Sequence, residues 1–139
     1  MRIVFFGTSE VGLPILEALT NWSEHEVIQV VTSPDAMVGR KQEMKPSPIN
    51  HLTTYLNIPI QNPERVRNNP DFLDYLKTLG ADIFIIVSYG KILPTELLDI
   101  PPFKTINVHF SLLPKYRGAA PIQYALLNGE TTTGTTIFI

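Results

Sequence analysis

Three strand-like stretches of the chain limit the possible folds most strongly. Residues 2–6 (RIVFF), 26–32 (EVIQVVT) and 82–88 (DIFIIVS) are rich in β-branched and aromatic side chains. A strand whose successive residues are nearly all apolar is covered on both faces, as the strands of a parallel sheet are. The longest of these runs is far too short to cross a bilayer. We therefore expect buried parallel strands.

Helical patterns separate the apolar runs. Strands that alternate with helices predict an α/β fold with a doubly wound, mostly parallel, Rossmann-like sheet. Residues 33–48 (SPDAMVGRKQEMKPSP) are expected to form a long polar loop. Thr8 or Ser9 is expected to cap the first helix, and Asp71 to cap the third. The expected helices are residues 11–19, 49–56, 72–79, 94–98 and 121–127, and the further strands are the short edge segment 58–60 and residues 105–110 and 135–139.

The composition is that of a globular domain. Hydrophobic residues make up 44% of the 139 residues and charged residues 17%, and the net charge of −2 gives no sign of a nucleic-acid binder. The absence of cysteine excludes a disulfide framework, a thiolate nucleophile and a thiolate metal site. The chain begins directly with a strand pattern, so we expect a cytoplasmic protein without a signal peptide. We also expect a monomer. It ends inside the apolar run TTIFI, so we expect an incomplete domain.

Asn107 and His109 are the first candidate site residues. They are two positions apart in an expected strand, so both side chains point to one face at its carboxyl end. An amide donor beside an imidazole can stabilise a developing oxyanion and transfer a proton, as acyl transfer to an amine requires. A buried Asn–His pair that only satisfies the backbone is the structural alternative.

Two features follow this strand. The segment Ser111-Leu112-Leu113-Pro114 has no ionisable group, so it offers only backbone groups and an apolar wall, which suits a flat heteroaromatic ligand. A plain irregular turn is the alternative. Arg117-Gly118 precedes a helix and could place a cation near an anion, although an exposed arginine is the simpler interpretation.

Nucleotide and metal sites are poorly supported. The segment from Gly7 to Gly12 (GTSEVG) lacks the central glycine of a dinucleotide-binding loop and the lysine of a P-loop. The histidines, His25, His51 and His109, lie far apart without the spacing of metal ligands, so no metal is expected.

The chain closely resembles the folate-dependent formyltransferases. The resemblance rests on the segment 107–114 (NVHFSLLP), followed by residues 117–123 (RGAAPIQ), and it continues through the whole chain. Further matches are RIVFFGTSE at the start, Ser33-Pro34-Asp35, Gly39-Arg40, the segment 46–48 (PSP), the turn at 88–94 (SYGKILP), and Gly129-Glu130 with Thr133-Gly134. Within the family, the chain looks most like the members that formylate methionyl-tRNA in translation initiation.

The resemblance implies a function and a set of site residues. Formyl would pass from 10-formyltetrahydrofolate to the amino group of initiator methionyl-tRNA, without a metal. Asn107 and His109 would stabilise the oxyanion, with the imidazole also transferring a proton. Ser111, Leu112, Leu113 and Pro114 would line the folate site, Ile92 and Leu93 would hold the pterin by main-chain contacts, and Arg40, Lys41 and Lys45 would contact transfer-RNA phosphates.

Two departures from the family pattern qualify these expectations. Phe110 stands where family members often carry a small residue, so it either packs in the core or narrows the pocket. A third catalytic residue of the family, an aspartate, follows the strand TTIFI, so residues 1–139 would be an incomplete catalytic domain. It would lack the C-terminal RNA-binding domain and have little or no activity.

Three other functions stay open. A nucleotide-sugar amine formyltransferase shares the Asn-x-His and Ser-Leu-Leu-Pro elements, whereas a glycinamide ribonucleotide formyltransferase generally lacks Arg-Gly-Ala-Ala-Pro. A non-catalytic module that binds a dinucleotide or a partner is the alternative from another class.

Overall fold

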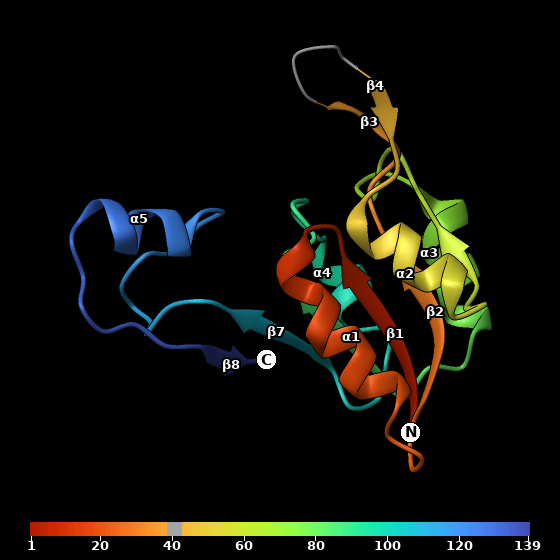
Figure 1. Ribbon diagram of the computed structural model, residues 1–139. Coiled ribbons are helices and arrows are strands. Elements are labelled where there is room, and N and C mark those ends of the chain that lie inside the picture. The colour runs from red at the N-terminus through yellow and green to blue at the C-terminus, as the bar shows by residue number, and fades with distance from the viewer. Residues whose placement is uncertain (39–42) are drawn as a thin grey trace.

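A twisted six-stranded sheet forms the centre of the molecule. The computed structural model describes residues 1–38 and 43–139. The strands lie in the order β5-β2-β1-β6-β7-β8, and all neighbours are parallel except β7 and β8, which are antiparallel (Figure 1). The expected doubly wound, mostly parallel sheet is therefore confirmed. The strands are β1 (Arg2–Gly7), β2 (Glu26–Val31), β5 (Ile60–Gln61), β6 (Ile83–Val87), β7 (Thr105–His109) and β8 (Thr136–Phe138).

Helices cover both faces of the sheet, and two apolar cores result. One core joins the sheet to α1 and α2 through residues such as Leu16 and Ile49. The other joins it to α3 and α4 through residues such as Leu76 and Leu97. The helical segments are the 3-10 turn η1 (Glu10–Gly12), α1 (Leu13–Thr20), α2 (Pro48–Tyr55), α3 (Pro70–Thr78), α4 (Thr95–Leu98) and α5 (Pro121–Leu127).

Strand β1 shows why its sequence is apolar throughout. Ile3 and Phe5 pack in the core under α1 and α2, whereas Val4 and Phe6 pack in the core under α3 and α4. All four side chains are at most 1% exposed. A strand in the middle of the sheet has no solvent-facing side, so the continuous apolar run is the expected pattern.

The segment between β2 and α2 differs from the expected loop. Two short strands, β3 (Ala36–Val38) and β4 (Glu43–Lys45), pair antiparallel and form a hairpin that extends away from the sheet (Figure 1). Met37 lies opposite Met44, and both are more than half exposed. The sequence did not predict these strands. A hairpin that is exposed on both faces needs no alternation of apolar and polar residues, so the usual strand pattern is absent.

The third helix begins earlier than expected. Its N-cap is Asn69, not Asp71, and the Asn69 side chain accepts a hydrogen bond from the backbone N–H of Phe72 at 3.1 Å. Pro70 occupies the first helical position, where its missing N–H costs nothing. Asp71 therefore lies in the first turn, where its charge still favours the helix dipole.

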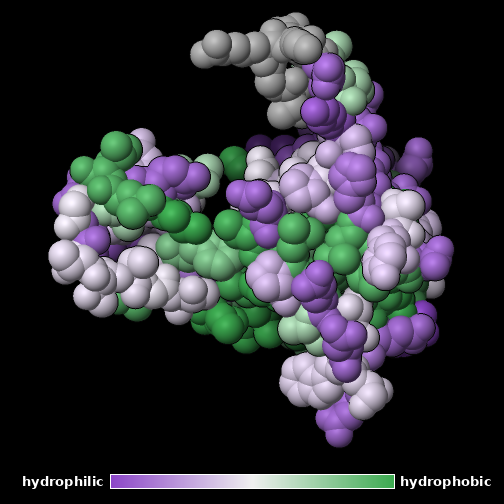
Figure 2. Space-filling model, viewed as in Figure 1, coloured by the Kyte–Doolittle hydropathy of each residue, from purple (hydrophilic) through white to green (hydrophobic). Residues whose placement is uncertain are grey.

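The last part of the chain exposes apolar side chains. Leu126 and Leu127 of α5 are 72% and 80% exposed, and Ile137 of β8 is 65% exposed. Figures 1 and 2 show α5 standing apart from the sheet core, with apolar side chains on its surface. Among the described residues, no helix combines the length and the apolar character needed to cross a membrane.

Candidate active site

A cavity of about 760 Å³ lies at the carboxyl ends of β6 and β7. Its walls come from the β6 strand and the loop after it, from β7, from the segment that precedes α5 and from the last residues of the chain. In a parallel sheet, ligands bind beyond the carboxyl ends of the strands, next to the point where the strand order reverses. That reversal is between β1 and β6, beside this cavity.

The loops after β1 and β6 are joined by hydrogen bonds. The Thr8 hydroxyl donates to the Tyr89 carbonyl at 2.9 Å, and the Thr8 backbone N–H donates to the Ser88 carbonyl at 3.2 Å. The Ser9 hydroxyl donates to the Ser88 hydroxyl at 2.8 Å. Ser88 has a φ of 50°, in the left-handed region. These bonds fix the loop that forms one wall of the cavity.

Asn107 and His109 both line the cavity. They belong to β7, where alternation places their side chains on the same face. Asn107 lies between Ile86 of β6 and Phe138 of β8 in the sheet, and His109 pairs with Thr136 at the strand end. Both are half-buried, so their polar atoms can meet a ligand while the backbone around them is fixed.

The imidazole of His109 has a backbone partner. Its Nε2 lies 2.8 Å from the Tyr116 carbonyl oxygen. A carbonyl oxygen only accepts hydrogen bonds, so Nε2 must carry the proton in this contact. In the neutral ring, Nδ1 is then the nitrogen that can accept a proton. Sequence reasoning missed Tyr116, because a backbone carbonyl leaves no signal in the residue types.

The segment Ser111–Pro114 lies beside the cavity and is absent from its described lining. Ser111 is fully buried, and its hydroxyl donates to the Lys115 carbonyl at 2.7 Å, which closes the turn. The Thr136 hydroxyl donates to the Ser111 carbonyl at 2.7 Å and accepts from the Leu113 backbone N–H at 3.1 Å. Leu112 is 53% exposed, and Pro114 is also exposed.

Ile92 and Leu93 line the cavity from the loop after β6. The Ile92 side chain is 82% exposed, so its main chain is the part that can serve a ligand. Next to it, the Lys91 ammonium donates to the carbonyls of Pro63 and Glu64 at 2.7 and 2.9 Å. Partial burial lowers the pKa of Lys91, and the nearby Glu64 carboxylate opposes this shift. Lys91 thus links the loop after β6 to the segment that follows β5.

Other cavity residues were not identified from the sequence. Tyr89 is 2% exposed, and burial raises its pKa to about 12. Lys104 and Asp99 form an ion pair of 2.9 Å at the far wall, where both side chains are half exposed. Phe110, which the sequence had singled out, lines the cavity and also packs against the core under α1 and α2.

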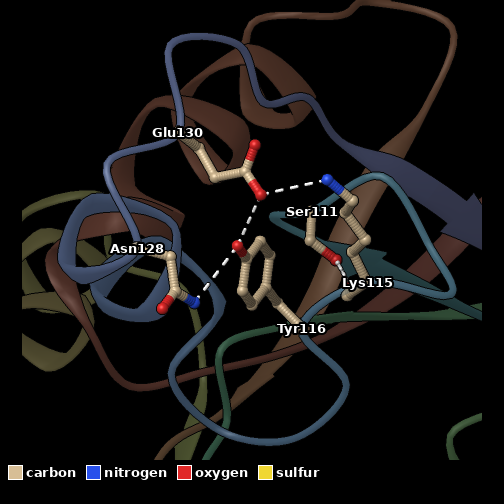
Figure 3. A network of polar contacts seen from close by, with 5 residues as sticks. All are labelled: Ser111, Lys115, Tyr116, Asn128 and Glu130. Carbon is tan, nitrogen blue, oxygen red and sulfur yellow. Dashed lines mark hydrogen bonds and ion pairs between the residues drawn. The ribbon is translucent and has the colours of Figure 1, made fainter.

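A polar network lies behind the turn at 111–118 (Figure 3). The Tyr116 hydroxyl donates to Glu130 Oε1 at 2.6 Å, and the Asn128 amide donates to the Tyr116 hydroxyl at 3.2 Å. The Lys115 ammonium lies 3.0 Å from the same Glu130 oxygen. The hydrogen bond from Tyr116, and then the one from Lys115, lowers the pKa of Glu130. The network joins the turn after β7 to the segment between α5 and β8.

Of the predicted RNA-contacting residues, Lys45 is described by the structure, and it does not line this cavity. Lys45 is exposed on β4 and forms an ion pair of 3.2 Å with Glu43. Arg40 and Lys41 lie outside the described residues. Among the residues that the structure describes, no group of three or more His, Cys, Asp or Glu side chains has an arrangement that could hold a metal ion.

Comparison with known proteins gives matches along the whole chain. A methionyl-tRNA formyltransferase of a Sulfurihydrogenibium species is 47% identical over 137 residues, which are 99% of this chain and 44% of the relative. The methionyl-tRNA formyltransferase of Trichormus variabilis is 47% identical over 139 residues, which are 100% of this chain and 42% of the relative. The chain therefore spans less than half the length of these curated relatives.

Solved structures share the fold. The phosphoribosylglycinamide formyltransferase of Bacillus halodurans superposes with a TM-score of 0.75 at 20% identity, over 99% of this chain and 70% of that one. A formyltetrahydrofolate deformylase of Pseudomonas syringae superposes with a TM-score of 0.68 at 21% identity, over 98% of this chain and 44% of that one.

The family assignment rests on the sequence as a whole. The family model described as formyl transferase matches residues 1–139, which is the entire chain. Together with the relatives above, this match favours a group-transfer enzyme over a dinucleotide-binding module. The chain belongs to the formyl transferase family.

Proposed function

We propose that the protein transfers a formyl group from 10-formyltetrahydrofolate to the amino group of methionyl-tRNA. The observation that supports this best is the pair Asn107 and His109 at the carboxyl end of β7, both lining the cavity of about 760 Å³. Curated relatives at 47% identity are named methionyl-tRNA formyltransferase, which supports methionyl-tRNA as the acceptor. The proposed setting is a cytoplasmic, monomeric enzyme of which residues 1–139 contribute the folate-binding part.

Formyl transfer requires one group that stabilises the oxyanion and another that transfers the proton. When bound, the donor supplies a formyl carbon that gains a bond to the amine nitrogen and loses its bond to N10. The Asn107 amide donates an N–H to the formyl oxygen as it becomes negative. His109, whose Nε2 proton is engaged by the Tyr116 carbonyl, takes up the amine proton at Nδ1 and returns it to the leaving nitrogen.

The cavity suits a folate. Its volume lies inside the range of roughly 300–1,000 Å³ that is typical of small-molecule sites. The main chain of Ile92 and Leu93 is the proposed partner of the pterin edge, and Phe110 and Phe138 offer apolar walls. Residues 111–114 would support this site from behind, because Ser111 is buried and its polar groups already have partners.

The RNA would contact the hairpin formed by β3 and β4. Lys45 is exposed there, and its ammonium suits a phosphate. Arg40 and Lys41 are proposed for the same role on chemical grounds, because phosphate contacts come mostly from arginine and lysine.

The test is a formylation assay with the complete, naturally encoded protein. Asn107→Ala and His109→Ala should each lower kcat by about 10²–10⁴-fold, the range for loss of an oxyanion donor or an acid–base group. Tetrahydrofolate affinity, measured by calorimetry, should change little in either variant. His51→Ala is the matched control, since His51 is exposed on α2 and outside the cavity lining.

The acceptor is tested separately. Methionyl-tRNA, an amino sugar nucleotide and glycinamide ribonucleotide are compared as acceptors with one formyl donor. The highest kcat/KM is expected for methionyl-tRNA. A higher value for either of the other amines would replace the proposed acceptor, and undiminished turnover by His109→Ala would reject the proposed site.

A further inference from the structure

The side chains of Glu130, Tyr116, Asn128 and Lys115 form a polar network that the proposed chemistry does not use (Figure 3). Glu130 is its centre, because one oxygen of its carboxylate takes contacts from both Tyr116 and Lys115. The Glu130 side chain is 26% exposed, whereas the Lys115 side chain is 65% exposed. Since exposed ion pairs contribute little, the hydrogen bond from the Tyr116 hydroxyl is the more important contact.

The position of Glu130 is set by the end of helix α5. The Glu130 backbone N–H donates to the Ala125 carbonyl at 3.0 Å, and the Gly129 N–H donates to the Leu126 carbonyl at 3.0 Å. Gly129 has a φ of 67°, as the residue that ends a helix commonly does. The carboxylate is therefore presented from a fixed helix terminus to the turn at 111–118.

Tyr116 has contacts at both of its ends. Its hydroxyl contacts Glu130, and its backbone carbonyl accepts the proton of His109 Nε2 at 2.8 Å. Its φ of 55° is in the left-handed region, which a residue with a bulky side chain rarely adopts unless its surroundings impose it. The Glu130 hydrogen bond is such a constraint, because it fixes the side chain while the carbonyl turns toward His109.

We propose that Glu130 is a positioning residue that acts through Tyr116 to hold His109 in the tautomer with the proton on Nε2. This inference rests on the proposed function, in which Nδ1 of His109 receives the proton of the attacking amine. Without Glu130, the Tyr116 side chain loses its charged acceptor, and the backbone at Tyr116 can relax out of the left-handed region. The carbonyl then leaves His109, and the ring populates both tautomers.

The experiment combines turnover with a direct measurement of the tautomer in the complete, naturally encoded protein. Long-range ¹H–¹⁵N spectra of histidine-labelled protein report which ring nitrogen is protonated, and the signals of His109 are assigned by their loss in His109→Gln. Wild type should show the proton on Nε2. Glu130→Ala should show averaged tautomers and a kcat lowered about tenfold, part of the 10²–10⁴-fold that a positioned acid–base group contributes. The KM for the formyl donor should stay within about twofold, since Glu130 is outside the described cavity lining.

Four further variants separate this role from a merely structural one. Glu130→Gln keeps an oxygen that can accept from Tyr116, so it should restore most of kcat. Tyr116→Phe removes the hydroxyl and keeps the carbonyl, so it should match Glu130→Ala, and the double variant should lose nothing more. Lys115→Ala removes the other partner of the same carboxylate and should behave as wild type.

The results distinguish this inference from the proposed function. No formylation by wild type would reject the function, while the tautomer spectra would still test the role of Glu130. A wild-type His109 protonated on Nδ1, or an unchanged tautomer and kcat in both Glu130→Ala and Tyr116→Phe, would overturn the inference. If Glu130→Ala does not fold, as judged by circular dichroism, Tyr116→Phe provides the same comparison.

Discussion

Two tyrosine hydroxyls, of Tyr75 and Tyr89, differ in whether they have a hydrogen-bond partner. The Tyr75 hydroxyl donates to Gln29 Oε1 at 2.6 Å, and Gln29 is 1% exposed. The Tyr89 hydroxyl is buried without a hydrogen-bond partner among the described residues. A substitution that leaves a buried polar atom without its hydrogen-bond partner lowers stability much more than one that removes an atom that had no partner.

This difference predicts opposite effects for the same substitution. Tyr75→Phe leaves Gln29 Oε1 buried without its donor, so the free energy of unfolding should fall by about 1–3 kcal/mol. Tyr89→Phe should leave it unchanged or raise it slightly. Equilibrium urea unfolding of the two variants beside wild type measures both values, and equal losses would show that the hydroxyl of Tyr89 does have a partner.

The raised pKa of Tyr89 also predicts that the protein loses stability at alkaline pH. Burial raises its pKa from 10.0 to about 12. Between these two values the unfolded chain has lost the proton and the folded chain has kept it, so stability falls as the pH rises. At 1.36 kcal/mol per pKa unit, the loss from this residue is about 2–3 kcal/mol by pH 12.

The test compares wild type with Tyr89→Phe, because the other tyrosines and the lysines titrate in both proteins. Unfolding free energies at several pH values from 8 upward should fall less steeply in the variant. Parallel curves would show that the Tyr89 side chain ionises as readily in the folded protein as in the unfolded chain.

At the scale of elements, the start of α2 depends on one serine. The Ser47 hydroxyl accepts from the Asn50 backbone N–H at 3.0 Å and lies 2.7 Å from the Thr32 hydroxyl at the end of β2. It therefore caps the helix and also connects the two ends of the segment that carries the β3–β4 hairpin. Pro48 follows at the first helical position, where proline is favoured.

Ser47→Ala should lower the free energy of unfolding by about 1 kcal/mol, the usual effect of removing an N-cap. Ser47→Asn should retain most of the stability, since asparagine caps as well as serine does. Thermal and urea unfolding of the two variants would test this. A loss in Ser47→Asn as large as in Ser47→Ala would mean that the contact with Thr32, not the cap, is the larger contribution.

At the scale of the whole molecule, the cavity and the hairpin are separate regions. Lys45 is on β4, whereas the cavity lining comes from β6, β7 and β8, from α4 and the start of α5, and from the loops between them. A charge on the hairpin should therefore affect RNA binding without affecting folate binding.

Lys45→Gln in the naturally encoded protein should weaken transfer-RNA binding and reduce the slope of log K against log salt concentration by about 1. Lys77→Gln is the matched control, since Lys77 is an exposed lysine on α3 with an ion-pair partner at 2.8 Å. Tetrahydrofolate affinity should be unchanged in both. Equal salt slopes for wild type and Lys45→Gln would show that the RNA lies elsewhere.

Local patterns were sufficient for most of the architecture. The nearly continuous apolar runs of β1 and β6 predicted parallel strands covered on both faces, and the structure has them. Strand alternation alone predicted that Asn107 and His109 share a face. These inferences succeed because burial on two faces and a side-chain period of two are properties of a single strand and its neighbours in the sequence.

Other features were decided only by contacts between distant parts of the chain. The antiparallel pairing of β8, the β3–β4 hairpin and the wall formed by Lys104 and Asp99 follow from how the elements pack. The partner of His109 is a carbonyl seven residues away, and Tyr116, which supplies it, contacts Glu130 fourteen residues further on. A carbonyl is the same in every residue, and where it points depends on backbone angles that tertiary contacts impose. Thus the sequence by itself determined that Asn107 and His109 share one face of a strand, while the tertiary structure decided which ring nitrogen of His109 carries its proton.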